Sequence, residues 1–265
     1  MLGRRKLPQA YRAWNLKWGA PFGRPSAHGL SLRQRLESKS AASFGPFAFQ
    51  PSNLTRAFEY PWSFFAGHIR PGMRVLDVGG GLFGMQFVLA LSGCSVTNVD
   101  PSAKTGSSGP FSGWGLSPKT HRRMNRIFGT DVRLVADSVE NARLPAASFD
   151  RVYCLSVLEH LPFRDARRAI AAIERLLAPE GLLLLTVDLF LDVVPFGVMR
   201  RNVWGWNHDV YRLLRGSKLA LASGARSELL GFPEFDFDRV VRLVPRLLIG
   251  HYPCVSQAMA LRRPE

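Results

Sequence analysis

Arg74-Val-Leu-Asp-Val-Gly-Gly-Gly-Leu-Phe-Gly84 decides the fold of this 265-residue chain, together with Val96-Thr-Asn-Val-Asp100. The first stretch has the pattern of a buried strand, a glycine turn and the start of an apolar helix. The second is a strand that ends in an acid. Gly79, Gly81 and Gly84 form a G-x-G-x-x-G turn. This arrangement is typical of a site for an adenosine-bearing cofactor.

Each residue of the turn has its own predicted task. Gly79 permits the tight bend after the strand, Gly81 lets a ligand approach the backbone, and Gly84 lets the helix pack near the strand. Asp100 is expected to accept hydrogen bonds from both ribose hydroxyls. Three glycines in a row can also be a flexible loop, but the apolar strand and helix on either side favour a nucleotide-type site.

The residue two positions before Gly79 separates two classes of cofactor. Asp77 stands there, and a carboxylate would repel the pyrophosphate of a dinucleotide. S-adenosylmethionine carries an ammonium and a sulfonium instead, which a carboxylate attracts. The charge pattern therefore favours S-adenosylmethionine over a nicotinamide cofactor. Asp77 is predicted to act at its methionine end, through water or through backbone bonds.

From about Tyr60 onward the chain resembles the class I S-adenosylmethionine-dependent methyltransferases, of the type common among small-molecule enzymes. The glycine turn resembles the first motif of that family, and Asp100 resembles its ribose-binding acid. Further segments resemble the third strand, the fourth strand with the turn after it, and the fifth strand: Leu134–Ser138, Phe149–Leu161 and Leu177–Asp188.

The resemblance also implies roles for individual residues of these later motifs. Asp137 corresponds to the acid that contacts the adenine amino group, with Ser138 beside it. The alternative is that Asp137 is a loop acid that caps the following turn, which Ser138 could also do. Ser156, directly after the fourth strand, is assigned to the cofactor site as well.

The order of elements predicts an α/β, Rossmann-like fold in which a parallel sheet has helices on both faces. The resemblance implies a seven-stranded sheet in the order 3-2-1-4-5-7-6, with the last strand antiparallel. Strands are expected near 73–78, 95–99, 132–136, 149–155, 181–188, 239–248 and 254–262. Helices are expected near 61–69, 84–92, 118–128, 163–177 and 207–216.

The chain is predicted to consist of a methyltransferase domain over 60–265 and a basic, aromatic-containing N-terminal extension over 1–59. Trp14 and Trp18 lie one helical turn apart, which predicts a short amphipathic helix docked on the core. Residues 101–116 form a Gly-rich segment with two aromatic residues, which favours a lid over a plain insertion. Residues 190–235 are predicted to bind the acceptor.

The net charge of +15 is spread unevenly. Residues 1–70 carry eleven Lys and Arg against two acids, or +9 of that total. A basic arm can steer phosphorylated substrates, nucleic acid or an anionic membrane surface. Only six of the thirty-five basic residues are lysines, so an arginine-biased genome explains the excess without a partner. The second explanation is favoured.

The cysteines exclude two classes of site. Cys94, Cys154 and Cys254 are scattered without metal-ligand spacing, which predicts buried thiols, no disulfide framework and no metal site. No apolar run approaches the roughly 18 residues of a membrane span, so no transmembrane segment is expected. A cytoplasmic location fits these features, and the oligomeric state stays open.

The residues that follow the fourth and fifth strands are the candidates for catalysis. Methyl transfer is an in-line displacement in which the enzyme aligns the nucleophile and removes its proton. His160 has a suitable pKa for a base, and Asp188 could orient it or act itself. Some antibiotic-sugar O-methyltransferases resemble this pattern. A structural role for His160 at a helix start is the alternative.

The sequence therefore predicts an S-adenosylmethionine-dependent methyltransferase for a small molecule or glycan, with oxygen as the favoured target. One alternative is an RNA methyltransferase anchored by the basic arm. Ser156–Glu159 differs from the Asn/Asp-Pro-Pro-aromatic motif of base amino-methyltransferases, which counts against base N-methylation. Another alternative is a non-catalytic partner protein that keeps the cofactor fold. No motif identifies the acceptor.

Overall fold

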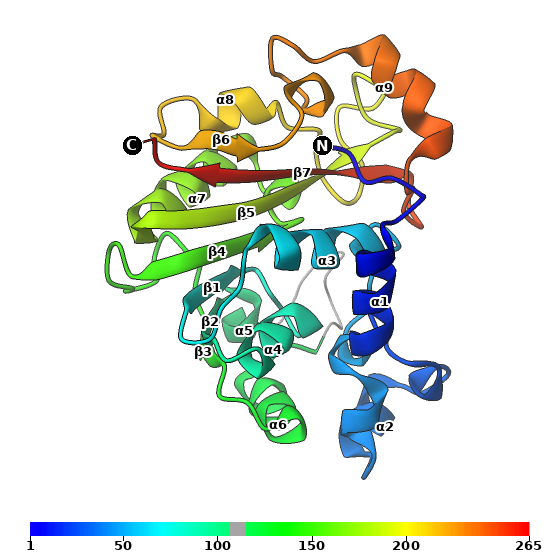
Figure 1. The fold of residues 1–265 in the computed structure, drawn as a ribbon, viewed down its shortest axis with the longest axis vertical. Helices are drawn as coiled ribbons and strands as arrows, with labels where there is room; N and C mark the ends of the chain where they lie inside the picture. The colour runs from blue at the N-terminus through cyan, green and yellow to red at the C-terminus, as the bar shows by residue number, and fades with distance from the viewer. Residues whose placement is uncertain (106–114, 265) are drawn as a thin grey trace.

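The computed structural model describes residues 1–105 and 115–264 and is built around a seven-stranded sheet, whose arrangement is drawn in Figure 1. The strand order is β3-β2-β1-β4-β5-β7-β6, and β7 runs antiparallel to both of its neighbours. The order and the antiparallel last strand are those predicted. The strands are β1 (Arg74–Val78), β2 (Ser95–Val99), β3 (Arg133–Val135), β4 (Phe149–Leu155), β5 (Leu177–Phe190), β6 (Ala220–Ser223) and β7 (Cys254–Arg262).

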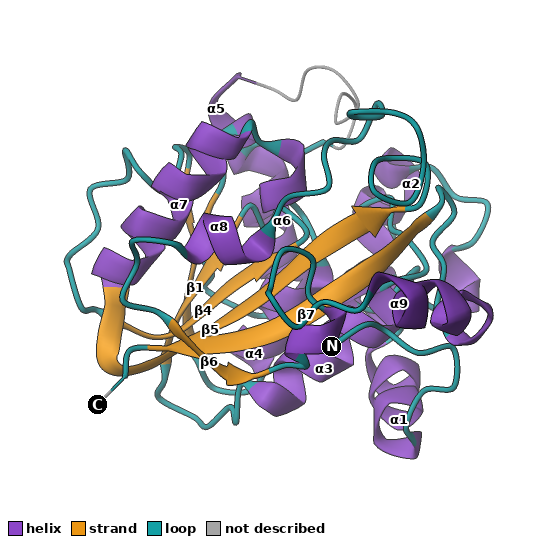
Figure 2. Cartoon of the chain, turned by 90° about the horizontal axis from the view of Figure 1, so that it is seen from above, coloured by secondary structure: helices purple, strands orange, loops and turns teal. Residues whose placement is uncertain are grey.

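Helices cover both faces of the sheet. One hydrophobic core joins helices α3 and α4 and the N-terminal segment to one face, and a second core joins α7 and α8 to the other face. Figure 2 shows these two pairs of helices on opposite sides of the strands. The α-helices are α1 (Gln9–Trp18), α2 (Leu32–Glu37), α3 (Arg56–Ala66), α4 (Gly84–Leu91), α5 (Ser102–Thr105), α6 (Pro118–Phe128), α7 (Phe163–Leu176), α8 (Val210–Leu214) and α9 (Phe237–Leu243).

Helix α3 begins earlier than predicted, so that Pro61 lies inside it rather than at its start. Proline has no N–H, so the carbonyl of Ala57, four residues earlier, loses its helical donor. The side chain of Asn15 in α1 supplies one instead, with Nδ2 donating to that carbonyl at 2.8 Å. The predicted N-terminal helix is therefore fastened to α3, and Trp14 is buried in the core between Phe47 and Phe64.

The rest of the 1–59 extension also packs on the domain. Its first residues run beside β7, where Leu2 pairs with Gln257 in an antiparallel bridge. The Met1 ammonium donates to the carbonyl of Ala258 at 2.6 Å. Leu2 is buried together with Leu189 and Val255.

The strand predicted near 239–248 was wrong. Asp236 caps the N-terminus of helix α9 there, since its carboxylate accepts from the backbone N–H of Arg239 at 2.8 Å. A 3-10 turn, Val244–Arg246, follows. Apolar residues spaced three to four apart gave the helix its buried face, and the strand beside β7 comes from Ala220–Ser223 instead.

The sequence also led to predictions about the cysteines, a lid segment and membrane spans. The three cysteines are free and buried, as expected. The proposed lid over 101–116 falls mostly on residues 106–114, which lie outside the described residues. Among the helices of the described ranges, none is long and apolar enough to cross a membrane.

Candidate functional site

A cleft of about 540 Å³ opens beyond the carboxyl ends of the parallel strands. Ligands of open α/β sheets bind at this edge. One end of the cleft is formed by the glycine turn and the end of β2, and the other by the segments that follow β4 and β5. Its lining comprises residues 50–53, Arg56, Gly79, Gly81, Phe83, 100–102, Leu116, 155–157, His160, Leu161, Trp204, His251 and Tyr252.

The glycine turn has the backbone conformation that the sequence predicted. Gly79 and Gly81 have φ of 69° and 50°, a region that side chains rarely tolerate. A Cβ on Gly81 would lie 2.6 Å from Oε1 of Gln50. The same Gln50 oxygen accepts from the backbone N–H of Leu82 at 2.5 Å. The N-terminal extension thus supplies a wall of the turn that the sequence did not reveal.

Asp100 lies at the floor of the cleft, directly after β2. Its Oδ2 accepts from the backbone N–H of Gly81 at 2.9 Å. Its Oδ1 accepts from Ser102 through the N–H at 2.9 Å and through the hydroxyl at 2.6 Å. Asp100 therefore links the glycine turn to the segment after β2, and its Oδ2, which accepts one of these bonds, still has a further lone pair.

Asp77 lies beneath the turn and does not line the cleft. It is almost fully buried, and its Oδ2 has no hydrogen-bond partner among the described residues. Burial, and to a lesser extent the negative charge of Asp100, raise the pKa of Asp77 to about 7. An unpartnered buried carboxylate is costly unless a cation neutralises it.

Three other predicted cofactor residues lie elsewhere. Gly84 packs on the N-terminal segment, because a Cβ there would lie 2.7 Å from the backbone of Pro46. Asp137 accepts from the backbone N–H of Ser138 at 2.9 Å. Neither Asp137 nor Ser138 belongs to the cleft lining in the described part of the chain, so their adenine contact stays a prediction.

His160 lines the opposite end of the cleft. It belongs to a 3-10 turn, Leu158–His160, that follows β4. Its Nδ1 is hydrogen-bonded to the backbone carbonyl of Trp204 at 2.5 Å. A carbonyl can only accept, so Nδ1 carries the proton and Nε2 is the basic nitrogen of the neutral ring. Burial is the largest influence on the pKa of His160 and lowers it to about 4.

An aromatic wall stands beside His160. The rings of Trp204 and Tyr252 stack, with centroids 4.7 Å apart and planes 22° apart. Trp204 comes from the segment after β5 and Tyr252 from the segment before β7. The Tyr252 hydroxyl donates to Oδ2 of Asp188 at 3.3 Å, so the wall is tied to a carboxylate behind it.

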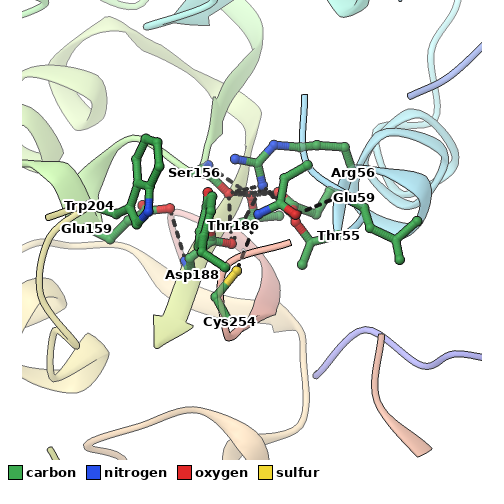
Figure 3. Close-up of polar contacts among 12 residues, drawn as sticks. Thr55, Arg56, Glu59, Ser156, Glu159, Thr186, Asp188, Trp204 and Cys254 are labelled. Atoms are coloured by element: carbon green, nitrogen blue, oxygen red, sulfur yellow. Dashed lines mark hydrogen bonds and ion pairs between the residues drawn. The ribbon is translucent and has the colours of Figure 1, made fainter. Parts of the chain in front are cut away.

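A buried ion cluster adjoins the cleft, and its members Arg56 and Ser156 belong to the lining. Figure 3 shows the contacts within this cluster. Arg56 and Glu59 of α3 form an ion pair. Nη1 of Arg56 also donates to the Ser156 hydroxyl at 2.7 Å and lies 3.6 Å from Oδ1 of Asp188. Thr186 donates to Oε2 of Glu59 at 2.7 Å. The cluster therefore joins α3 to the ends of β4 and β5.

Negative charge exceeds positive charge in this cluster. Glu59, Asp188 and Glu159 are fully buried around one guanidinium. Burial, and then the charge of Asp188, raise the pKa of Glu159 well above its usual range. Burial likewise raises the pKa of Asp188 to about 6, although Arg56 opposes the shift. Glu159 and Asp188 can therefore hold protons near neutral pH.

The cofactor half of the cleft fits S-adenosylmethionine. Gly79, Gly81 and Asp100 all line the cleft, and Oδ2 of Asp100 accepts only one hydrogen bond within the described part of the chain, so it can accept another from a ribose hydroxyl. The buried Asp77 oxygen without a partner suits a cationic ligand above it. Gly79, Gly81 and Asp100 are the residues that would hold the cofactor.

Residues 52–223 match a family model described as a methyltransferase domain, which is more than half of the chain. The chain belongs to this methyltransferase family. It is a class I S-adenosylmethionine-dependent methyltransferase, and S-adenosylmethionine is its cofactor.

One named relative supports the assignment, and one solved structure shares the fold. The ubiquinone biosynthesis O-methyltransferase of Paracidovorax citrulli (strain AAC00-1) is 28% identical over 212 residues, which cover 73% of this chain and 78% of the relative. The 1,6-didemethyltoxoflavin-N1-methyltransferase of Burkholderia thailandensis, crystallised with S-adenosylhomocysteine, has a TM-score of 0.51 at 18% identity and covers 100% of this chain and 95% of its own.

A further solved structure shares the fold. The [4+2]-cyclase SpnF has a TM-score of 0.56 at 14% identity, and the likeness covers 100% of this methyltransferase and 99% of SpnF. At such low identity the likeness describes the fold alone. The chemistry of the methyltransferase must therefore be argued from its own side chains.

The structure brings some predicted site residues of the methyltransferase together and separates others. Gly79, Gly81 and Asp100 meet at one end of the cleft. Ser156 and His160 line the cleft as well. A Cβ on Gly79 would lie 2.8 Å from Cγ2 of Val157, the residue after Ser156, and the cofactor contact of Ser156 stays a prediction. Asp188 is fully buried behind Ser156, whose hydroxyl lies 3.3 Å from Oδ1.

Sequence reasoning missed the contribution of residues outside the motifs. Gln50 and Arg56 precede the predicted domain, and Tyr252 lies just before the last strand. One signal was present for Arg56 and Glu59, which are charged residues three apart in a helix that is otherwise mostly apolar. Gln50 and Tyr252 carry no comparable local signal, because only the tertiary fold brings them to the cleft.

Proposed function

We propose that this methyltransferase transfers a methyl group to a hydroxyl of a small molecule, with His160 as the general base. The hydrogen bond between Nδ1 of His160 and the Trp204 carbonyl is the observation that carries the proposal. It selects the tautomer in which Nε2 can accept a proton, in a residue that lines the cleft. A hydroxyl nucleophile needs such an acceptor, whereas a neutral amine can attack before it loses its proton.

The tasks left to the protein are modest. Bound S-adenosylmethionine supplies a methyl group that is already activated for displacement. The glycine turn and Asp100 hold one end of the cleft, and the Trp204–Tyr252 wall confines an acceptor at the other end. His160 then takes the hydroxyl proton as the oxygen attacks. Burial lowers its pKa to about 4, which keeps the imidazole neutral throughout the physiological range but makes it a weaker base than its ordinary pKa suggested in the sequence.

Asp188 fits a positioning role better than direct proton transfer from the acceptor. It does not line the cleft, and both of its oxygens have partners. Through Ser156 and Tyr252 it holds two residues that do line the cleft. Arg56 keeps Asp188 in place by its charge. We assign Asp188 to the support of this wall.

The volume of the cleft and the function of a named relative both support a small-molecule acceptor. A cleft of about 540 Å³ lies within the range of roughly 300–1,000 Å³ that small-molecule sites occupy. The relative from Paracidovorax citrulli is an O-methyltransferase of ubiquinone biosynthesis. We infer that oxygen is the atom methylated by this chain as well.

Methyl transfer from isotope-labelled S-adenosylmethionine to matched acceptors tests the proposal. The acceptors are phenols and sugars, together with amines in which nitrogen replaces the reacting oxygen. We expect labelled methyl ethers, located by NMR, and no labelled amines. Methylation of the amines alone, or of RNA offered in parallel, would refute the proposal.

A further inference from the structure

The segment after β5 carries apolar side chains into solvent. Val198 is 95% exposed and Val203 is 72% exposed, and Val194 and Met199 of the same segment are exposed as well. The segment is held in shape, because the N–H of Val194 donates to the carbonyl of Met199 at 2.8 Å. A contiguous group of exposed apolar residues on a structured loop marks an interaction site.

Helix α9 continues this surface. The ring of Phe196 packs against the ring of Phe237, with centroids 5.0 Å apart, so the loop and the helix lie side by side (Figure 1). Phe237 and Val241, one helical turn apart, are exposed. The two elements together present apolar side chains from residues 194–203 and from one side of α9.

Basic side chains surround these apolar ones. Arg200 and Arg201 lie within the loop, and Arg239, Arg242 and Arg246 lie on or just after α9; all five are exposed. The N–H of Arg5 donates to the carbonyl of Arg246 at 2.9 Å, which brings the exposed Arg5 and Lys6 of the N-terminal arm beside them. Asp236 and Asp238 are the exposed acids at the start of the helix.

We propose that this apolar-basic surface, formed by residues 194–203, α9 through Arg246, and Arg5 with Lys6, binds bilayers that contain anionic lipids. Apolar side chains on a basic surface insert at the boundary between headgroups and acyl chains. Arginines among them keep their guanidinium groups at the phosphates while their stems cover apolar area. The core of a protein–protein interface is usually depleted of charged residues. Here, charged residues surround the apolar ones, which fits a membrane surface better than a protein partner.

The surface adjoins the cleft through a shared segment. Trp204, directly after Val203, forms the cleft wall with Tyr252. Docking would therefore bring the acceptor end of the cleft close to the bilayer. If the proposed function holds, and this step rests on it, an amphiphilic acceptor that partitions into the bilayer enters from that side.

Vesicle sedimentation tests the proposal with the full-length protein. The probes are vesicles of phosphatidylcholine alone and vesicles of phosphatidylcholine with phosphatidylglycerol. We expect sedimentation with the anionic vesicles, decreasing as salt is added, and little with the neutral ones. Val198→Asp combined with Val203→Asp should abolish it. Leu16→Asp is the matched control, because Leu16 is 82% exposed but lies on α1, and it should bind like wild type.

A second pair of changes tests the charge. Arg242→Gln and Arg246→Gln should each weaken binding to anionic vesicles roughly fivefold. Equal binding to neutral vesicles, wild-type binding by the Val198/Val203 double variant, or salt-sensitive binding to single-stranded RNA without vesicle binding would overturn the proposal. So would a dimer in sedimentation analysis that the double variant dissociates. Titration with S-adenosylhomocysteine keeps this result separate from the proposed function, since variants that only lose the vesicles retain cofactor affinity.

Discussion

Nδ1 of His160 donates a hydrogen bond to the backbone carbonyl of Trp204, 44 residues further along the chain. The bond joins the turn after β4 to the loop after β5, so one contact fixes the orientation of the imidazole and the position of the aromatic wall. Because the acceptor is a backbone atom, substitution of the Trp204 side chain leaves the partner of the imidazole in place. The base and the wall can therefore be perturbed separately.

Asp100→Ala should weaken the binding of S-adenosylhomocysteine. The change removes the carboxylate predicted to hold the ribose and also the tie between Gly81 and Ser102. Hydrogen bonds to charged groups contribute about 1.5–3 kcal/mol each, so the Kd measured by calorimetry should rise by at least roughly tenfold. Asp131→Ala, at an exposed acid, is the control. An unchanged Kd in Asp100→Ala would remove Asp100 from the cofactor site.

Asp77 should make cofactor affinity depend on pH. Its pKa is raised to about 7 in the folded protein, so the carboxyl gains a proton as pH falls through 7 and then attracts a cationic ligand less. Affinity for S-adenosylmethionine, whose sulfonium makes it cationic, should therefore decrease from pH 7.5 to pH 5.5 in the wild type. Asp77→Asn should bind more weakly at pH 7.5 and lose this part of the dependence. Identical pH dependence in both proteins would contradict this role.

The same raised pKa has a consequence for stability. A carboxyl whose pKa is higher folded than unfolded stabilises the fold at low pH, and this contribution is lost as pH rises through about 7. The melting temperature of the ligand-free wild type should therefore fall relative to that of Asp77→Asn between pH 5 and pH 8. A difference that stays constant over this range would show that the carboxyl is not titrating.

Arg56→Met should destabilise the fold strongly. It would leave Glu59 and Asp188 buried without the cation that compensates them, and breaking a buried ion pair in this way costs about 3–5 kcal/mol. Adding Glu59→Gln should recover part of the loss, because one buried charge disappears. Arg33→Met is the control, since the Arg33–Glu37 pair is exposed and should change stability by less than about 1 kcal/mol. Denaturant unfolding gives the free energy of unfolding of the wild type, the two single variants and the Arg56→Met/Glu59→Gln double variant.

The acid limb of the pH–rate profile should report Asp188 rather than His160. The pKa of His160 is about 4, and that of Asp188 is about 6. As pH falls through 6, Asp188 becomes neutral and its hold on Arg56 and Tyr252 weakens, so kcat/KM should decrease there. Asp188→Asn should lower the rate at pH 7.5 and flatten the profile between pH 7.5 and 5. If the decrease in kcat/KM near pH 6 persists in Asp188→Asn, a group other than Asp188 causes it.

Local patterns in the sequence were sufficient for most of the fold. Strands β1, β2 and β4 and the helices after β1 and β4 were predicted within a few residues, because apolar runs, helical apolar spacing and turn glycines act locally. Residues 239–248 were predicted wrongly, because a short apolar run without its partners fits a strand as well as a helix. The cap by Asp236 decides in favour of the helix.

The sequence predicted the site residues that belong to motifs. It did not predict the site residues that distant segments of the chain supply. Gly79, Gly81, Asp100 and His160 reach the cleft directly from strand ends, where the fold class places ligands. Gln50 and Arg56 reach it because the N-terminal segment wraps back onto the domain. That wrapping depends on contacts such as Asn15 with the carbonyl freed by Pro61, which local periodicity does not encode.

Methyl transfer by His160→Ala tests the central claim most directly. With labelled S-adenosylmethionine and a hydroxyl acceptor that the wild type uses, kcat should fall by about 10²–10⁴-fold, while calorimetry gives an unchanged Kd for S-adenosylhomocysteine. His28→Ala, at an exposed histidine, should retain the wild-type rate. Transfer by His160→Ala at the wild-type rate would contradict the assignment of His160 as the base.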